Sequence, residues 1–491
     1  MNFAGWRAGL LCLLLLAGIG FLYTASALRG PANRIQSPEV LHKAGSLLHD
    51  YASSAKTFDG TTPYCPASLG DDKIALIVKT GATEALERIP TQLVTSLRCV
   101  QHPIIVSDLE QTLGRHRIHD VLANIAPEDK DENPEFNIYR KQHEYVTSGR
   151  ATELRSLSSL PISQDDWRTK GKTAAWGLDK YKFLHMVEKA WELQPQRDWY
   201  VFIEADTYIS WPNLHSFLEH YDAQKPWYFG SAVLMHEHKP TILHFAYGGS
   251  GFILSGSVVK DWAINHSGLA NRWDKRISEM WFGDFVLADA LDEELQVTIT
   301  DATPMMHPDE PALVPFGADT WCKPVATLHH LDSRQINELY QTEMALNSSH
   351  LRFKDVYRSA YLAGLPFRLD DQDNLADDHK FAIDVIPNDM ERFHGQWEPK
   401  DLVDPNQSYN ACELACIQND GCFQFSFVTT TANEADGGTQ CFLSSVFRLG
   451  RRRELEKWFD KKTKISYQRN WISGWRSDRI SRWIEEHERC I

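Results

Sequence analysis

Two carboxylates stand two positions apart at the end of a short apolar run. The run, residues 199–203, is rich in aromatic and β-branched residues, which predicts a strand buried on both faces of a parallel sheet. Glu204 and Asp206 follow it, at the strand end where ligands bind in open α/β sheets. Their oxygens suit a hard divalent cation such as Mg²⁺ or Mn²⁺, which keeps open positions for substrate phosphates. By itself an E-x-D triplet favours an ordinary polar strand end that leads into a turn, so other motifs must decide.

The elements before this run predict the sheet that positions it. Residues 73–80 and 103–107 read as strands, and an amphipathic helix around 88–97 lies between them. A strand-helix-strand unit of this kind opens a doubly wound α/β nucleotide-binding sheet. We therefore expect Thr80, which ends the first strand, and Asp108, which follows the second, to contact a nucleotide. There is no G-x-G-x-x-G or P-loop sequence, so dinucleotide and ATP-type phosphate binding are not supported.

Further chemistry-bearing residues follow the central run in order. Gly248 and Gly249 would let the backbone approach a ligand closely, although a plain tight turn explains them equally well. Asp284 opens a predicted helix, and His329 ends a last predicted strand. The remaining predictions are long irregular connections over 120–160, helices over 176–191 and 212–221, a strand over 227–234, and the last strand over 325–330.

Composition narrows the class of partner. The chain has 491 residues, with 51 Lys and Arg against 66 Asp and Glu, and a net charge of −15. This acidity argues against a nucleic-acid partner, which would need a basic surface. If the protein handles phosphate, a metal ion is better suited to it than a patch of basic side chains.

The amino terminus predicts a membrane anchor. Residues 8–28 carry no charge and are dominated by leucine, which is long enough to cross a bilayer. We expect a cytoplasmic tail at 1–7, a transmembrane signal anchor at 8–28 and a stem at 29–70. A cleaved signal peptide is the alternative, because residues 25–27 form an A-x-A cleavage pattern. Both interpretations place the body of the chain in the secretory pathway.

Cysteine usage agrees with that compartment. Of nine cysteines, eight lie outside the apolar segment, an even number that is compatible with four disulfides. No paired C-x-x-C pattern supports a structural zinc. Three N-glycosylation sequons begin at Asn265, Asn347 and Asn406. A cysteine-dense module is predicted at 406–445, after a charged connection at 346–405 and before a tail at 446–491.

Six short motifs, each weak alone, resemble in the same order those of the Golgi β1,3-glycosyltransferases of family 31, the Fringe and core 1 galactosyltransferase group. They lie at residues 198–209, 228–230, 247–255, 283–286, 307–308 and 322–338. The resemblance implies a GT-A fold over residues 71–345 and an inverting, metal-dependent transfer from a UDP-sugar.

The resemblance also implies residue roles. Asp206 and His329 would ligate Mn²⁺, and Glu204 would lie near the ribose or the metal. With a UDP-sugar as the nucleotide ligand, the strand-end and turn residues named above, Thr80, Asp108, Gly248 and Gly249, are expected to bind it. Asp284 would act as general base on the acceptor hydroxyl, with a pKa kept low by the helix dipole. Asp284 could otherwise be an ordinary helix cap, and His329 a satisfied strand-end histidine.

Two positions depart from the family pattern. Ala205 replaces the middle acid of the metal-binding triplet, and Gly283 replaces a glutamate beside Asp284. The last acid of the triplet, Asp206, is retained. The departures put acceptor or donor contacts in doubt more than metal binding.

The cysteine-dense module resembles a PAN/Apple unit, which implies protein or carbohydrate binding and needs disulfides in place of a large core. We expect the pairs Cys412–Cys441 and Cys416–Cys422. Cys65–Cys99 would tie the stem to the first strand-helix unit. Cys322–Cys490 is then left by elimination. A structural appendage packed on the catalytic domain is the alternative interpretation of the module.

Together these features predict a single-pass type II Golgi membrane enzyme with a lumenal catalytic domain. We expect an N-acetylgalactosaminide β1,3-galactosyltransferase-like activity on a glycan or glycoprotein acceptor, with GlcNAc or glucose as alternative donor sugars. A second hypothesis is a lectin-like or chaperone-like protein without catalytic activity, in which Ala205 and Gly283 mark the loss of that activity. A surface adhesion protein that acts through the PAN-like module is a third.

Overall fold

The structure is a computed structural model that describes residues 73–162, 173–235, 243–346, 350–361, 363–377, 379–382, 404–433 and 437–490. The chain divides into two compact units, Met1–Thr61 and Thr62–Ile491, and all described residues belong to the second. The predicted cytoplasmic tail, membrane anchor and stem, with Cys65, lie outside the described residues. Asn347 of the second sequon lies outside them too.

None of the helices in the described part of the chain combines the length and the apolar character that a membrane span requires.

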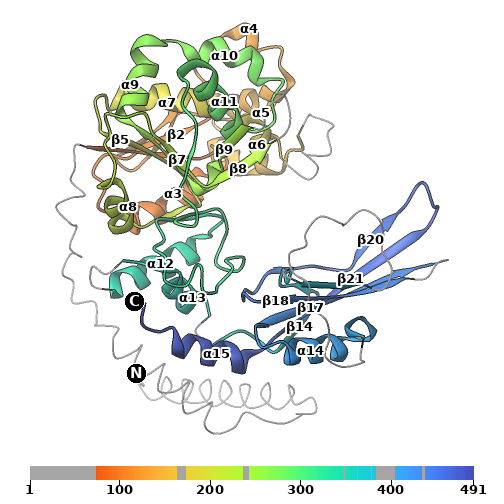
Figure 1. Cartoon of the computed structure of the whole chain (residues 1–491). Helices are drawn as coiled ribbons and strands as arrows, with labels where there is room; N and C mark the ends of the chain where they lie inside the picture. The colour runs from red at the N-terminus through yellow and green to blue at the C-terminus, as the bar shows by residue number, and fades with distance from the viewer. Residues whose placement is uncertain are drawn as a thin grey trace, which may run out of the picture. The chain divides into compact units, whose positions relative to one another are not determined.

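An eight-stranded sheet forms the centre of the first half of the unit (Figure 1). The strand order is β11 (Thr300–Asp301), β7 (Tyr228–Gly230), β10 (Phe252–Ser255), β5 (Trp199–Glu204), β1 (Ile74–Lys79), β2 (Ile104–Ser107), β4 (His116–Asp120) and β3 (Gln111–Leu113). Neighbours pair in parallel from β5 through β1 and β2 to β4, and also between β11 and β7. β10 runs antiparallel to both of its neighbours, and β3 runs antiparallel to β4. The α/β class that the sequence predicts is confirmed.

Both faces of this sheet are buried, which explains the nearly continuous apolar runs of its strands. In β1, alternation sends Ala75 and Ile77 into one apolar cluster and Leu76 and Val78 into the other. The first cluster is formed with α7 (Lys182–Leu193), α9 (Gly256–Asn265), α10 (Leu269–Ile277) and α11 (Gly283–Leu295), and the second with α3 (Ala85–Val94) and α8 (Trp211–Leu218).

Several predicted elements differ from the structure. Residues 120–160, which we predicted to be irregular, contain α4 (Pro127–Lys130), η2 (Pro134–Phe136), α5 (Asn137–Thr147) and η3 (Ala151–Ser159). The predicted helix at 176–191 is divided into α6 (Ala174–Asp179) and α7. The predicted strand at 227–234 is two strands, because the chain leaves the main sheet after Gly230 and forms the separate pair β8 (Ala232–Met235) with β9 (Leu243–Ala246).

A small three-stranded sheet joins the end of the central strand to the last predicted strand. Its order is β12 (Met306–His307), β13 (Thr327–Leu328) and β6 (Tyr208–Ile209). Helices α12 (Ser333–Ala345), α13 (Phe353–Ala360) and α15 (Ser477–Glu486) share a third apolar cluster with residues of the C-terminal region.

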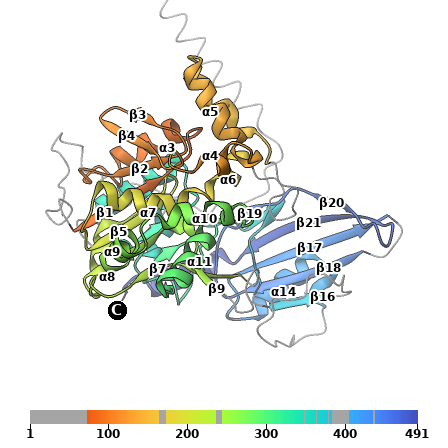
Figure 2. The ribbon, with the colours of Figure 1, turned by 90° about the horizontal axis from the view of Figure 1, so that it is seen from above.

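The C-terminal region is a second sheet with α14 (Tyr409–Gln418) against it (Figure 2). The strands are β14 (Arg368–Asp370), β21 (Ser466–Trp475), β17 (Gln424–Ala432), β18 (Gly438–Ser444) and β16 (His379–Ala382) in that order, with β20 (Glu456–Phe459) beside β21. Two short strands, β15 (Gln372–Asp373) and β19 (Arg451–Arg452), pair separately, and η6 (Pro405–Gln407) precedes α14.

These pairings correct the sequence-based boundaries. The predicted connection at 346–405 supplies β14, β15 and β16, and the predicted tail supplies β19 to β21. Trp471 and Trp475 both lie on strand β21, within the predicted tail.

The disulfides of the described residues join pairs that the sequence analysis named. They are Cys412–Cys441, Cys416–Cys422 and Cys322–Cys490. Cys99 is also disulfide-bonded, and its predicted partner Cys65 is outside the described residues.

The small three-stranded sheet, α12 and α13 share one apolar cluster with the C-terminal region. Phe316 forms a β-bridge with Phe447, and Trp475 and Ile480 lie in the same apolar cluster as Trp321. The C-terminal region is therefore part of the fold. The sequon asparagine Asn406 is buried there, and its side chain accepts a hydrogen bond from the backbone N–H of Cys441 (2.9 Å).

Candidate active site

The acidic end of β5 sends its side chains in alternate directions. Ala205 is buried in the second apolar cluster with Ile203, whereas Glu204 and Asp206 are partly exposed. An acid at position 205 would therefore face the core in this chain. This placement explains how the middle acid of the triplet can be absent while the two outer acids keep their positions.

Asp206 and His329, which are far apart in the sequence, meet because their strands pair. In the β6–β13 ladder Leu328 lies opposite Tyr208, and the backbone N–H of Leu331 donates to the carbonyl of Asp206 (3.0 Å). His329 Nε2 consequently lies 3.2 Å from Asp206 Oδ1 and 4.0 Å from Glu204 Oε2. The structure brings together the three side chains that were predicted to lie at the metal.

His330 completes a set of donors that suits a divalent cation. One ligand atom each from Asp206, His329 and His330 lies within 4.8 Å of the others. Among the described residues, the buried Nδ1 of His329 has no hydrogen-bond partner. A carboxylate oxygen with imidazole nitrogens fits a first-row divalent metal ion. His330 also has a left-handed backbone conformation (φ 61°), a strained state that is often found at functional sites.

The charges of this cluster are mutually dependent. Burial alone would raise the pKa of Asp206, but the hydrogen bond and charge of His329, together with Arg88, lower it to about 2. Burial alone would lower the pKa of His329, but Asp206 raises it above the ordinary value. Burial and the neighbouring His329 lower the pKa of His330. Asp206 is thus ionised and His330 neutral at pH 7, whereas a metal ion would have to displace the proton that the raised pKa favours on His329.

A buried glycine turn lies between His329 and Asp284. A Cβ atom at Gly249 would stand 2.0 Å from Cε1 of His329, and one at Gly248 would stand 3.2 Å from Cβ of Asp284. The carbonyl of Gly249 accepts a hydrogen bond from the Thr207 hydroxyl (2.7 Å). The two glycines therefore permit the close packing of the two predicted functional groups. Their predicted contact with a nucleotide stays a prediction.

Asp284 is held in the first turn of α11 by two backbone donors. Its Oδ2 accepts from the N–H of Gly248 and its Oδ1 from the N–H of Phe285, both at 2.9 Å. The prediction of a low pKa is wrong. Burial raises the pKa of Asp284 to about 6, and the negative charge of Glu204 adds to this rise. The two backbone hydrogen bonds lower the pKa, but by less than burial raises it. Desolvation outweighs the helix dipole here.

The structure also explains the glycine that departs from the family pattern. A Cβ at Gly283 would lie 2.1 Å from Cδ2 of Phe183 and 2.9 Å from Cα of Lys180. Position 283 therefore has no room for a glutamate while Phe183 keeps its place. Asp284 is left as the carboxylate at this turn.

Buried charges that the sequence analysis did not identify support the end of β1. Lys79 is ion-paired with Asp179 and lies 3.1 Å from Glu204 Oε1. Lys182 contacts the same Asp179 (3.1 Å) and Asp108 (3.4 Å). Two sequence signals could have revealed this network. Lys79 is the last residue of a buried strand, and Asp179 and Lys182 stand three residues apart where a helix begins. This network holds Glu204 beside Asp206, His329 and His330.

Asp108 and Thr80, the two residues that we expected to contact a nucleotide, differ in their hydrogen bonding. Asp108 is fully buried, and its carboxylate accepts from the N–H of Ala82 (2.8 Å) and from Gln142 (2.9 Å). It holds the turn that follows β1, and its predicted contact with a nucleotide stays a prediction. Thr80 lies in that turn, and its buried hydroxyl has no hydrogen-bond partner among the described residues. It remains available to a ligand that enters there.

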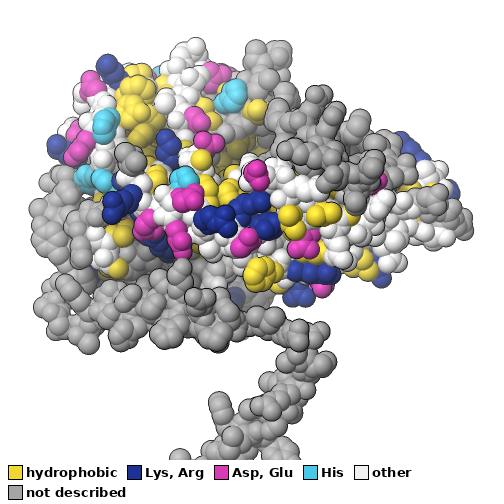
Figure 3. Space-filling model, turned by 60° about the horizontal axis from the view of Figure 1, so that its bottom comes forward, with side chains coloured by type: hydrophobic (Ala, Val, Ile, Leu, Met, Phe, Trp, Pro, Cys, Tyr) yellow, Lys and Arg dark blue, Asp and Glu magenta, His cyan; other side chains and the backbone are white. Residues whose placement is uncertain are grey.

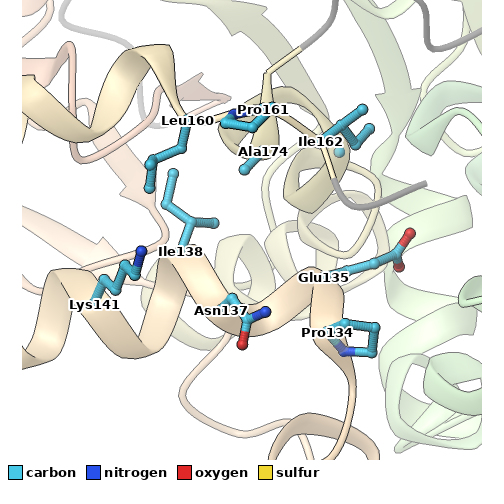
Figure 4. A pocket seen from close by; sticks show the side chains of 10 residues that line it. Pro134, Glu135, Asn137, Ile138, Lys141, Leu160, Pro161, Ile162 and Ala174 are labelled. Carbon is cyan, nitrogen blue, oxygen red and sulfur yellow. The ribbon is translucent and has the colours of Figure 1, made fainter. Parts of the chain in front are cut away.

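A separate cavity of about 250 Å³ lies beside α5 and α6 (Figure 4). Leu160, Ile162 and Ile138 give it an apolar wall, and Glu135, Asn137 and Lys141 add polar groups. None of the predicted site residues lines it.

The comparison with protein families agrees with this geometry. Residues 172–357 match a family model that is described as Fringe-like. The Fringe-like region contains Asp206, Asp284 and His329, and begins after β1 and β2. A Fringe-like domain of the family 31 type indicates a glycosyltransferase, and such enzymes use a UDP-sugar and typically a divalent metal. No curated protein matches the sequence significantly.

Proposed function

We propose that this protein is a metal-dependent, inverting glycosyltransferase of GT-A type. It transfers a sugar from a UDP-sugar to a glycan acceptor, and galactose is the sugar that we favour. The supporting observation is the meeting of Asp206, His329 and His330 beside Asp284 within the Fringe-like region. An N-acetylgalactosaminide β1,3-galactosyltransferase-like activity is the specific proposal. Localisation as a single-pass type II Golgi protein rests on the sequence alone.

In this proposal each residue has one task. Asp206, His329 and His330 would hold the divalent ion, which would neutralise charge on the departing diphosphate. Asp284 Oδ2, oriented by the N–H of Gly248, takes the proton from the acceptor hydroxyl as that oxygen attacks the anomeric carbon on the face opposite UDP. Lys79 holds Glu204 in place beside the cluster.

A donor screen tests the proposal. The purified full chain is incubated with each of several UDP-sugars, with and without Mn²⁺, and released UDP is measured with and without N-acetylgalactosaminide acceptors. We expect UDP-galactose to give the largest metal-dependent release and EDTA to abolish it. Metal-independent release, or no release with any donor, would contradict the proposal and favour the inactive lectin-like alternative.

The activity should fall in mild acid. Because the pKa of Asp284 is raised to about 6, this group is protonated below pH 6 and cannot accept a proton. With Mn²⁺ saturating at each pH, kcat/KM should drop about tenfold per pH unit below that value and level off above pH 7. A flat profile between pH 5 and pH 7 would show that Asp284 is not the base.

The packing of Gly249 against His329 predicts a large effect of one methyl group. Gly249→Ala places a Cβ 2.0 Å from the His329 ring, so the ring must move away from Asp206. We expect Mn²⁺ affinity, measured by calorimetric titration, to weaken by about 10–100-fold. Gly421→Ala is the matched control, because the nearest atom to its Cβ is 3.5 Å away. Equal affinities in the two variants would contradict the predicted metal site.

A further inference from the structure

A strongly basic segment stands out in this acidic chain. Residues 448–469 contain nine Lys or Arg against three Asp or Glu, a net charge of +6, whereas the whole chain carries −15. Charges of both signs are interspersed on the face shown in Figure 3. The segment comprises β19, β20 and the start of β21, and we call it the basic ribbon. Among the described residues, Arg452, Lys457, Lys461, Lys462 and Lys464 are exposed and form no ion pair.

One end of the ribbon reaches the rim of the candidate active site. The parallel ladder of β12 and β13 ends where His307 lies opposite Leu328, and Asp309, two residues further on, interacts electrostatically with His330. Arg451 Nη2 lies 3.9 Å from Asp309 Oδ1. The backbone N–H of Gly450 donates to the carbonyl of Ala312 (2.8 Å), which fixes the ribbon at this point. The exposed guanidinium of Arg451 therefore stands beside the segment that carries His330.

From that end a row of alternating cations and rings runs along the sheet. Arg453 and Arg469 lie 5.1 and 5.8 Å from the ring of Trp471, and Arg469 also lies 5.1 Å from the ring of Trp458. Trp458 stacks on Tyr467 at 5.1 Å. The row occupies the sheet face opposite α14, because the neighbouring positions of β17, Phe425 and Phe427, pack with the helix cysteines. Planar rings with adjacent guanidinium groups are suited to sugar rings that carry anionic substituents.

We propose that the basic ribbon binds the acceptor and that this acceptor is a glycan carrying negative charge, with carboxylate, sulfate or phosphate groups. The inference rests on the proposed function, because it treats the site beside Arg451 as the site of transfer. The overall charge of −15 repels a polyanion, so binding of one would have to come from a local positive surface. Partly exposed Trp458 and Tyr467 favour a glycan over an acidic polypeptide.

Binding to defined polymers tests the ribbon without turnover. The full chain is titrated at 0.1 M salt with dextran sulfate, neutral dextran and poly-glutamate of matched charge. We expect binding to dextran sulfate, none to dextran, and a loss of at least ~10-fold in affinity in both Arg451→Glu/Arg452→Glu and Lys461→Glu/Lys462→Glu/Lys464→Glu. Arg115→Glu and Arg482→Glu, at exposed sites outside the ribbon, are the charge controls.

The outcomes separate the inference from the proposed function. If the ribbon variants bind dextran sulfate as the wild type does, or poly-glutamate binds more tightly than dextran sulfate, the inference is overturned. In the transfer assay the ribbon variants should raise KM for an anionic acceptor by at least ~10-fold and leave KM for the UDP-sugar within about twofold. Absence of UDP release by the wild type contradicts the proposed function, whereas release with an unchanged acceptor KM in the variants overturns only the inference.

Discussion

Asp206→Ala is expected to lower kcat/KM for sugar transfer by at least about 10³-fold. Asp206 supplies the carboxylate of the predicted metal site and lies 3.2 Å from His329 Nε2. Charge stabilisation by a metal at a phosphoryl oxygen contributes several kcal/mol, and about 4 kcal/mol corresponds to a thousandfold change in rate. Released UDP, measured over a range of Mn²⁺ concentrations, provides the readout.

Controls distinguish loss of the metal site from loss of the fold. Asp222→Ala removes an exposed carboxylate of the turn after α8 and should keep full activity. Asp206→Asn keeps the shape of the side chain, so its thermal unfolding should match the wild type while Mn²⁺ binding is lost. If Asp206→Ala turns over at the wild-type rate with the same metal requirement, the proposed chemistry is wrong.

Asp284→Asn is expected to reduce kcat by about 10²–10⁴-fold while Mn²⁺ affinity stays within about twofold. The amide cannot accept the acceptor proton, and general-base catalysis contributes rate factors of this size. The variant should fold, because its side-chain oxygen can still accept the hydrogen bond that the N–H of Gly248 donates. Single-turnover assays with saturating UDP-sugar and acceptor measure the effect.

The pH profile gives a second readout for the same residue. Residual activity of Asp284→Asn should lose the acid limb near pH 6, because that limb is assigned to the Asp284 carboxyl. Asp289→Asn is the control, because it removes a different carboxylate of α11, one that is paired with Arg276. Its pH profile should keep the fall in activity below pH 6. An unchanged kcat in Asp284→Asn would assign the proton transfer to another group.

Much of the fold was predictable because it depends on local pattern. The apolar runs that became β1, β2 and β5 were long enough and β-branched enough to be identified, and their acidic or glycine ends marked the ligand side of the sheet. The division of residues 227–234 between two sheets was not predictable. Gly230 accommodates Ala246 so closely that a Cβ there would lie 2.3 Å away, and such contacts depend on partners distant in sequence.

The same distinction applies to the C-terminal region. The resemblance gave Cys412–Cys441 and Cys416–Cys422, and elimination gave Cys322–Cys490, all of which the structure contains. The extent of the sheet was not evident, because β14 and β16 are short, polar and separated from the cysteines by sequence that has no clear period. Their assignment follows from pairing with β21 and β18.

The sequence by itself determined the chemical groups of this protein: a strand-end aspartate, a strand-end histidine, a helix-start aspartate and the glycines between them. Only the tertiary structure decided how they act together. Pairing of β6 with β13 brings Asp206 to His329, and packing around α11 removes enough water from Asp284 to raise its pKa against the helix dipole. Residue type is a local property, whereas distance and desolvation are set by segments that meet only when the chain folds.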